Sequence, residues 1–448
     1  MAEQEQNQQS EFMIEKIKER PVNKRKLFRR TMITAAMAMV FGLIACLTFL
    51  FLEPVISNWL HPEEKPKPIV FPEDQEEMAP EDMLSENSSE SIFGMDSTSE
   101  EQKEQLQELF SNLVLDRNNY KQIYSDLAKY VNELNHSMVT ITGVSSNIDW
   151  FNNVEESKDQ SFGVIIANNG VELLVLTDYA PLNKAESFTL SFAYLESAIS
   201  GNVSIPAVLK SLDKSTGFAV LSAELEDVPS EVLESENGIK IAPLGFSNVR
   251  NIMGTPVIAL GNPMGSSGSV GYGMISAVIS QNQQADVNFK FLQTNIYGSQ
   301  NASGILFNLQ GQVLGVVSGQ RPNSDMKNMV TAIGISEIKK NIEKMSNGEE
   351  MAYLGINGID VTEEANVELG VPYGAFVRET EMGSPSMQAG IQQGDVLVGF
   401  GEKNIRNYND YIDALEEAQV GSTVELKVMR SAMGEYKEMK IKVTLEER

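Results

Sequence analysis

The spacing of apolar residues changes three times along the 448 residues of this chain. Residues 31–52 form an uncharged and mostly apolar run, about as long as the ~20 residues that a helix needs to span a bilayer. Between residues 105 and 135, apolar positions recur at steps of three and four, which predicts an amphipathic helix. From residue 136 onward, short β-branched runs separated by turn signals predict many short strands.

The charges around residues 31–52 predict a membrane anchor. The basic residues that precede the run are Lys16, Lys18, Arg20, Lys24, Arg25, Lys26, Arg29 and Arg30. Because acidic residues follow the run, the positive-inside bias makes residues 1–30 a cytoplasmic basic tail and residues 31–52 a single transmembrane helix. The remainder is then extracytoplasmic, on the outer side of the cell membrane. A cleaved signal peptide is the alternative, disfavoured because the run is long and no small-residue cleavage site follows it.

Residues 53–104 are rich in acidic residues, proline and serine, which predicts a disordered acidic linker. The apolar stripe of the predicted helix at 105–135 consists of Leu106, Phe110, Leu113, Tyr120, Tyr124, Leu127, Val131 and Leu134. Two interpretations of this stripe stay open. The helix either self-associates as a coiled coil or packs as an amphipathic helix on the domain that follows.

Two folded domains are predicted after the helix. Residues 136–346 carry many short strands, which favour an all-β barrel or sandwich, and a helix near residues 336–344 closes this unit. Residues 350–448 combine strands with a helix around residues 408–418, which predicts a separate α+β module.

Composition excludes several function classes. The formal net charge of −27 excludes nucleic acid as a partner, because phosphates require a basic surface. The single cysteine, Cys46, excludes an intramolecular disulfide framework. No cluster of ligating residues has metal-site spacing and no loop has the glycines that cradle phosphate, so we expect neither a metal nor a cofactor.

Four sequence blocks within residues 136–346 resemble the trypsin-like domain of the HtrA family (DegP/DegS-like). They begin at Ser161 (SFGVII), Thr216 (TGFAVL), Ala259 (ALGNPMG) and Gln293 (QTN, followed by NASGILFN). The resemblance implies a trypsin-like double β-barrel followed by a C-terminal PDZ domain of α+β type. It also implies self-assembly, since HtrA relatives form trimers.

The same resemblance implies that the catalytic triad is lost. The histidine, aspartate and serine positions of the family fall on Ala180, Gly217 and Ala302. Alanine offers neither a base nor a nucleophile, and glycine offers no carboxylate to orient a base. The family's oxyanion-hole glycine falls on Gln300, so this element also looks damaged.

A displaced nucleophile is the alternative. Ser299 or Ser303 could take the role of the missing serine, provided that a base activated it. The chain has two histidines, His61 and His136, which lie beside the predicted membrane span and at the start of the first predicted strand. Neither position matches that of the family's histidine, so the pseudoenzyme interpretation is favoured.

The C-terminal module resembles a PDZ domain that keeps its recognition loop. In such a loop, successive backbone N–H groups converge on a terminal carboxylate, and the peptide adds to the sheet as a strand. The predicted peptide-binding residues are Tyr353, Leu354, Gly355, Ile356, Tyr411 and Leu415. Plain core packing is the alternative interpretation for the helix residues, above all for Ile412.

These features together predict a membrane-anchored, extracytoplasmic pseudoprotease of HtrA type. It would bind protein C-termini or unfolded polypeptides in envelope quality control or regulation, and an active HtrA protease is a further expected partner. We expect a homo-oligomer, with a trimer as the family's precedent. An active trypsin-like serine endopeptidase is the main alternative, and an assembly protein that uses the PDZ fold only as a surface is the other.

Overall fold

The computed structural model describes residues 28–29, 32–44, 48, 66–72, 117–148, 154–192, 203–233, 238–281, 284–299, 301–319, 328–432 and 434–448. The chain divides into two compact units, residues 1–65 and residues 66–448, and each is considered by itself. Most of the predicted acidic linker, residues 105–116 of the predicted amphipathic helix, and Gln300 lie outside the described residues.

Residues 32–44 of the first unit are helical, within the segment for which the sequence predicts a membrane span. Among the described residues, the structure contains no helix that combines the length and the apolar character needed to span a membrane. The predicted span at 31–52 includes residues outside the description, so the anchor stays a prediction.

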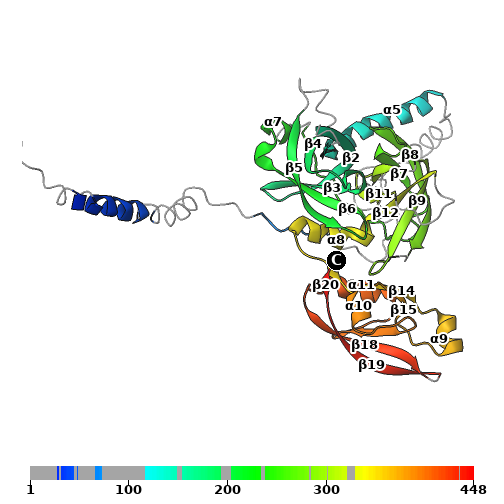
Figure 1. Ribbon diagram of the computed structural model, residues 1–448. Coiled ribbons are helices and arrows are strands. Elements are labelled where there is room, and N and C mark those ends of the chain that lie inside the picture. The colour runs from blue at the N-terminus through cyan, green and yellow to red at the C-terminus, as the bar shows by residue number, and fades with distance from the viewer. Residues whose placement is uncertain are drawn as a thin grey trace, which may run out of the picture. The chain divides into compact units, whose positions relative to one another are not determined.

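The first half of the trypsin-like region is a closed six-stranded barrel with the strand order β1-β2-β3-β6-β5-β4 (Figure 1). Its strands are β1 (Met138–Ile148), β2 (Val154–Asn168), β3 (Glu172–Asp178), β4 (Ser187–Ser191), β5 (Ser204–Asp213) and β6 (Phe218–Glu224). All neighbouring strands pair antiparallel. Closure removes the free edges that an open sheet would expose.

A second closed barrel follows, with the order β10-β11-β12-β9-β8-β7. Its strands are β7 (Pro256–Asn262), β8 (Ser269–Gln281), β9 (Phe289–Tyr297), β10 (Ser303–Asn308), β11 (Val313–Val317) and β12 (Met329–Gly334). Helix α8 (Ile335–Asn347) comes directly after β12 and ends at Gly348, whose positive φ of 68° suits a helix C-cap. The predicted all-β double barrel, closed by a helix, is confirmed.

The continuous apolar runs in the sequence arise because several strands are buried on both faces. In β3, Leu173 and Val175 belong to the core inside the first barrel, whereas Leu174 and Leu176 belong to the core between the barrels. Strand β10 is buried throughout in the same way. Alternate residues of a strand point to opposite faces, so an uninterrupted apolar run is what such a double-sided environment requires.

Helix α5 (Arg117–Leu134) leads into the first barrel through the short helix η1 (Asn135–Ser137). Val131 and Leu134 are buried in the core between the barrels, and Leu127 packs against it. Tyr120 and Tyr124, from the earlier part of the predicted stripe, remain exposed. The C-terminal end of the stripe therefore packs on the following domain, as one of the two interpretations predicts. The first turns of α5 leave the side chains of Tyr120 and Tyr124 exposed.

A short part of the predicted linker, residues 66–72, is bound to the trypsin-like domain. The backbone of Ile69 exchanges two hydrogen bonds of 2.8 Å with the side chain of Asn347, at the end of α8. Phe71 N–H donates to Glu343 at 2.9 Å, and both apolar side chains, Ile69 and Phe71, pack against the main core. These apolar residues distinguish the segment from the acidic residues around it.

The C-terminal module is built on a sheet in the order β14-β15-β16-β18-β19, with β17 paired to β16 (Figure 1). Its strands are β14 (Ile356–Asp360), β15 (Ala375–Thr380), β16 (Val396–Phe400), β17 (Lys403–Asn404), β18 (Thr423–Ala432) and β19 (Glu435–Thr444). A second small sheet pairs β13 (Ala352–Tyr353) with β20 (Glu446–Glu447). The helices are α9 (Glu363–Leu369), α10 (Pro385–Gln388) and α11 (Tyr408–Glu416), so the predicted α+β module is confirmed.

Candidate functional site

The two positions to which the resemblance assigns the triad's histidine and aspartate, Ala180 and Gly217, lie next to each other in the first barrel. Ala180 begins the short helix η2 (Ala180–Leu182), just after β3 ends, and Gly217 lies in the turn between β5 and β6. Tyr179 N–H donates to the carbonyl of Gly217 at 2.9 Å, which holds the two segments together. Neither residue has a side chain that could accept or transfer a proton.

The third triad position lies at the start of the second barrel's β10. Ala302 is 2% exposed, and its N–H donates to the carbonyl of Ser299 at 3.2 Å. Ser303 follows it as the first residue of β10 and is buried. Ser299 Oγ accepts from Asn301 N–H at 3.2 Å, which is a turn-stabilising bond.

His136 is placed by η1, where its Nδ1 pairs with the carbonyl of Gly238 at 2.9 Å. This position is at the entry to the first barrel rather than in the segments that carry the triad positions. His61 lies outside the described residues. The structure therefore gives no support for His136 as the base that would activate a displaced serine.

A buried carboxyl that the sequence pattern does not single out lies beside Ala180. Asp178, at the end of β3, accepts a hydrogen bond from Ala180 N–H at 3.0 Å. Burial raises the pKa of Asp178 to about 6, and the bond from Ala180 only partly opposes this. The corresponding position in the family's block is asparagine, which could have drawn attention to the residue.

Replacement of Asp178 by asparagine is expected to stabilise the trypsin-like domain at neutral pH. The folded-state pKa of about 6 lies above the ordinary 3.8, so the stability that the acid form contributes is complete at low pH and is lost as pH rises through about 6. Above pH 7 the burial of ionised Asp178 therefore lowers the free energy of unfolding by ~3 kcal/mol. Asparagine avoids this cost and still accepts the hydrogen bond from Ala180 N–H. Urea unfolding of both proteins at about pH 4 and about pH 8 measures it. If the gain in unfolding free energy of Asp178→Asn did not increase with pH, the raised pKa of Asp178 would be contradicted.

The PDZ module forms its recognition loop between β13 and β14. Gly355 has a φ of +82°, and a Cβ there would clash with the Ser384 side chain, so the loop requires glycine at this position. The side chain of Tyr353 donates to Glu381. Burial and this hydrogen bond raise the pKa of Tyr353 well above its usual range, which keeps its hydroxyl protonated.

The N–H groups of this loop converge on one carboxylate, that of Asp286 from the trypsin-like domain. Leu354 N–H and Gly355 N–H donate to its Oδ2 at 2.7 and 2.6 Å, and Ile356 N–H donates to its Oδ1 at 3.0 Å. Tyr411 Oη on α11 also donates to Oδ1. The arrangement forms a carboxylate-binding site, because four donors converge on the two oxygens of one carboxylate.

Five of the six predicted binding residues lie at or directly beside the site that holds the Asp286 carboxylate. Leu354, Gly355, Ile356 and Tyr411 contact the carboxylate directly, and Tyr353 precedes them on β13. Burial and the charge of Asp286 raise the pKa of Tyr411 well above its usual value, so Tyr411 remains a donor.

Leu415, the remaining predicted residue, lies in the PDZ core. It is buried with Tyr408 and Tyr411 on the face of α11 that packs on the sheet. Ile412 is only partly buried and packs against the same core. Strand β14 is an edge strand next to α11, so a peptide strand can add there.

Sequence reasoning missed Asp286, Tyr408 and Arg448. Tyr408 Oη donates to the Ile356 carbonyl at 2.7 Å, and Arg448 donates to the Asp286 carbonyl at 2.9 Å. Asp286 lies in the loop between β8 and β9, far from the PDZ module in sequence. Nothing in the local pattern distinguishes it from the other acidic residues of this acidic chain.

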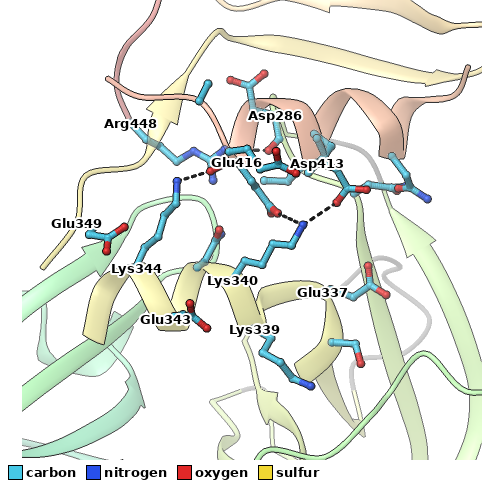
Figure 2. A pocket seen from close by; sticks show the side chains of 18 of the residues that line it. Asp286, Glu337, Lys339, Lys340, Glu343, Lys344, Glu349, Asp413, Glu416 and Arg448 are labelled. Atoms are coloured by element: carbon cyan, nitrogen blue, oxygen red, sulfur yellow. Dashed lines mark hydrogen bonds and ion pairs between the residues drawn. The ribbon is translucent and has the colours of Figure 1, made fainter. Parts of the chain in front are cut away.

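Ion pairs hold α8 of the trypsin-like domain near α11 of the PDZ module. Figure 2 shows Lys340 reaching between Asp413 and Glu416, at 3.2 and 3.5 Å. Lys344 donates to the backbone carbonyl of Glu416. These contacts line a polar groove of about 1550 Å³ between the two domains.

Comparisons with known proteins agree with this architecture. Residues 162–316 match the trypsin-like peptidase domain, and residues 352–445 match the PDZ domain. The chain is 29% identical over 294 residues to a probable periplasmic serine endoprotease, DegP-like, of Rickettsia prowazekii, a match that covers 63% of this chain and 52% of the relative. It is 26% identical over 351 residues to the serine protease Do-like HtrA of Bacillus subtilis, covering 72% of this chain and 73% of that protein. The chain therefore spans about half the length of the Rickettsia relative.

A solved structure, the HtrA-type protease AlgW with decapeptide, has the same fold. Its TM-score is 0.50 at 18% identity, and the superposition covers 71% of this chain and 98% of that one. A trypsin-like double barrel is thus followed by a PDZ domain, and the relatives named above match the larger part of the chain. The chain therefore combines a trypsin-like peptidase domain with a PDZ domain and is similar to serine proteases of the HtrA type.

Proposed function

We propose that this protein is an HtrA-type pseudoprotease that binds protein C-termini or unfolded segments through its PDZ domain. The observation that carries the proposal is the convergence of three backbone N–H groups, from Leu354, Gly355 and Ile356, on one carboxylate. By contrast, the positions that resemble the triad hold Ala180 and Gly217 in the first barrel and Ala302 in the second. Recognition is retained where the means of catalysis are lost.

The proposal includes a membrane anchor at residues 31–52, with the folded domains on the extracytoplasmic side. It is supported by the uncharged run and by the basic residues that precede it. A role in envelope quality control or regulation, a trimeric or other homo-oligomeric state, and an active HtrA protease as a partner complete the proposal.

The second candidate function is an active trypsin-like serine endopeptidase. It is favoured by the relatives, which are named as serine proteases, and by the position of Ser303 directly after Ala302. It requires an activated serine, because an unassisted hydroxyl is a poor nucleophile at neutral pH.

Peptide titration of the full-length protein tests the proposed function. The probes are fluorescein-labelled random heptapeptides that end in leucine, valine or phenylalanine, each as the free acid and as the C-terminal amide. We expect binding of the free acids and a loss of about 10-fold or more on amidation, since the loop then faces no charged acceptor. Equal affinity for acids and amides would overturn carboxylate recognition.

Substitution of Gly355 by alanine is expected to weaken binding of the free-acid peptides about 10-fold or more, because the added Cβ clashes with Ser384 and displaces the N–H donors. Gly370→Ala is the matched control. Gly370 also has a positive φ, of +64°, but nothing lies within 4 Å of its added Cβ, and it caps α9. Fluorescence anisotropy should show unchanged affinity in the control, and equal losses in both variants would point to general strain.

A further inference from the structure

We propose that the PDZ domain is self-ligated: Asp286 of the trypsin-like domain occupies the carboxylate site, so a C-terminal peptide binds only by displacing it. This inference rests on the proposed function and concerns the regulation of the same site. It begins from the position of Asp286, which is 1% exposed and lies in the β8–β9 loop.

Asp286 presents both groups that a C-terminal residue would present. Its carboxylate accepts from Leu354, Gly355 and Ile356, and its own N–H donates to the Ile356 carbonyl at 2.8 Å. A terminal residue likewise carries one amide N–H and one carboxylate. Asp286 adopts a positive φ of 57°, which aspartate tolerates better than most residues.

The site holds one carboxylate at a time. The backbone donors and Tyr411 Oη all point at the carboxylate of Asp286. A second carboxylate in the same buried space would meet like charge and find its donors already engaged. Peptide binding and the Asp286 contact are therefore mutually exclusive.

Neighbouring residues hold the Asp286 loop in place from both sides. Arg448, the final residue, donates to the Asp286 carbonyl at 2.9 Å and to Ser215 Oγ at 3.3 Å. Its guanidinium also lies 3.9 Å from the buried carboxylate of Asp213, while its backbone N–H donates to Met351. Val287 is buried in the main core. The occupied site is thus part of an ordered domain contact.

Occupation in cis lowers the apparent affinity for free peptides. A tethered group acts at an effective concentration in the millimolar range, so even a weak internal ligand competes well. The apparent dissociation constant rises by the reciprocal of the fraction of molecules whose site is open.

The test compares full-length wild type with Asp286→Gly and Asp286→Asn. Glycine accepts the positive φ of 57° and removes the carboxylate, whereas asparagine keeps the shape and removes the charge. With the same free-acid heptapeptides, we expect affinity to increase ~10-fold in Asp286→Gly and less in Asp286→Asn. Asp413→Ala is the matched control, because it removes an exposed ion pair with Lys340 across the same domain contact but leaves the carboxylate site intact.

Amide hydrogen exchange gives a readout that needs no ligand. The N–H groups of Leu354, Gly355 and Ile356 should exchange faster in Asp286→Gly and at the wild-type rate in Asp413→Ala. Equal peptide affinity and unchanged exchange in Asp286→Gly would overturn self-ligation and leave the proposed function standing. Failure of both wild type and Asp286→Gly to bind any free-acid peptide would overturn the proposed function itself.

Discussion

Unfolded β-casein is expected to remain intact when it is incubated with this protein. In a serine protease of this fold, the histidine takes the proton from the serine and the aspartate orients that histidine. Here the matching positions hold Ala180, Gly217 and Ala302, and none of these side chains can perform those steps. Loss of a whole triad costs ~10⁶-fold in kcat in subtilisin, which would place any remaining cleavage below detection.

The positive control for this experiment is the related Bacillus subtilis serine protease, assayed under the same conditions. Cleavage by the present protein would contradict the expectation only if it came from the chain itself. Ser299→Ala and Ser303→Ala separate the two cases, because one of them should abolish a genuine activity that uses a displaced serine. Cleavage unchanged in both variants would indicate a contaminating protease.

Arg430→Met is expected to destabilise the PDZ module by ~3 kcal/mol. Asp395 is 1% exposed, and Arg430 binds its two oxygens through Nε and Nη2, both at 2.7 Å. Arg430 also donates to the Gly390 carbonyl. Without it, the buried carboxylate keeps a hydrogen bond from Gln392 N–H but loses its charged partner. Removing one partner of a buried pair costs ~3–5 kcal/mol, and the partial exposure of Arg430 places the loss at the lower end.

Lys440→Met is the matched control for Arg430→Met. Lys440 on β19 pairs with Glu425 at 3.0 Å on β18, the strand that also carries Arg430, but both side chains of this pair are well exposed. Its loss should therefore leave the unfolding free energy nearly unchanged, because solvent screens an exposed ion pair. Pulse proteolysis of the full-length protein in urea, with PDZ-derived fragments quantified by mass spectrometry, measures both. Equal stability losses in the two variants would contradict the role of burial.

The double barrel and the PDZ module could be predicted because their signals are local. Short apolar runs such as Leu173–Leu176 predict strands, and the structure explains this uninterrupted run by burial on both faces. The loop at residues 353–356 could be predicted for the same reason, since Gly355 and its neighbours supply the N–H donors from consecutive positions. Local chemistry at consecutive residues can be read without knowing the tertiary structure.

The occupant of the loop could not be predicted from the sequence. Asp286 and Leu354 are separated by 68 positions, and their contact depends on how the two domains dock. Arg448 likewise meets Asp213 only after both domains have folded. The apolar stripe shows the same limit at α5, where Val131 and Leu134 are buried but Tyr120 is exposed. Periodicity identifies an apolar face and does not say which part of it is covered.

Labelling with a fluorophosphonate probe determines whether the protease fold of this protein contains an activated nucleophile; we expect that it does not. Such probes form a covalent adduct with a serine whose proton an adjacent base removes. The full-length protein and the Bacillus subtilis relative would be treated in parallel and read by intact mass and peptide mapping. We predict an adduct on the relative and none on this protein. An adduct on Ser299 or Ser303 would contradict the pseudoprotease proposal and show that this serine is activated.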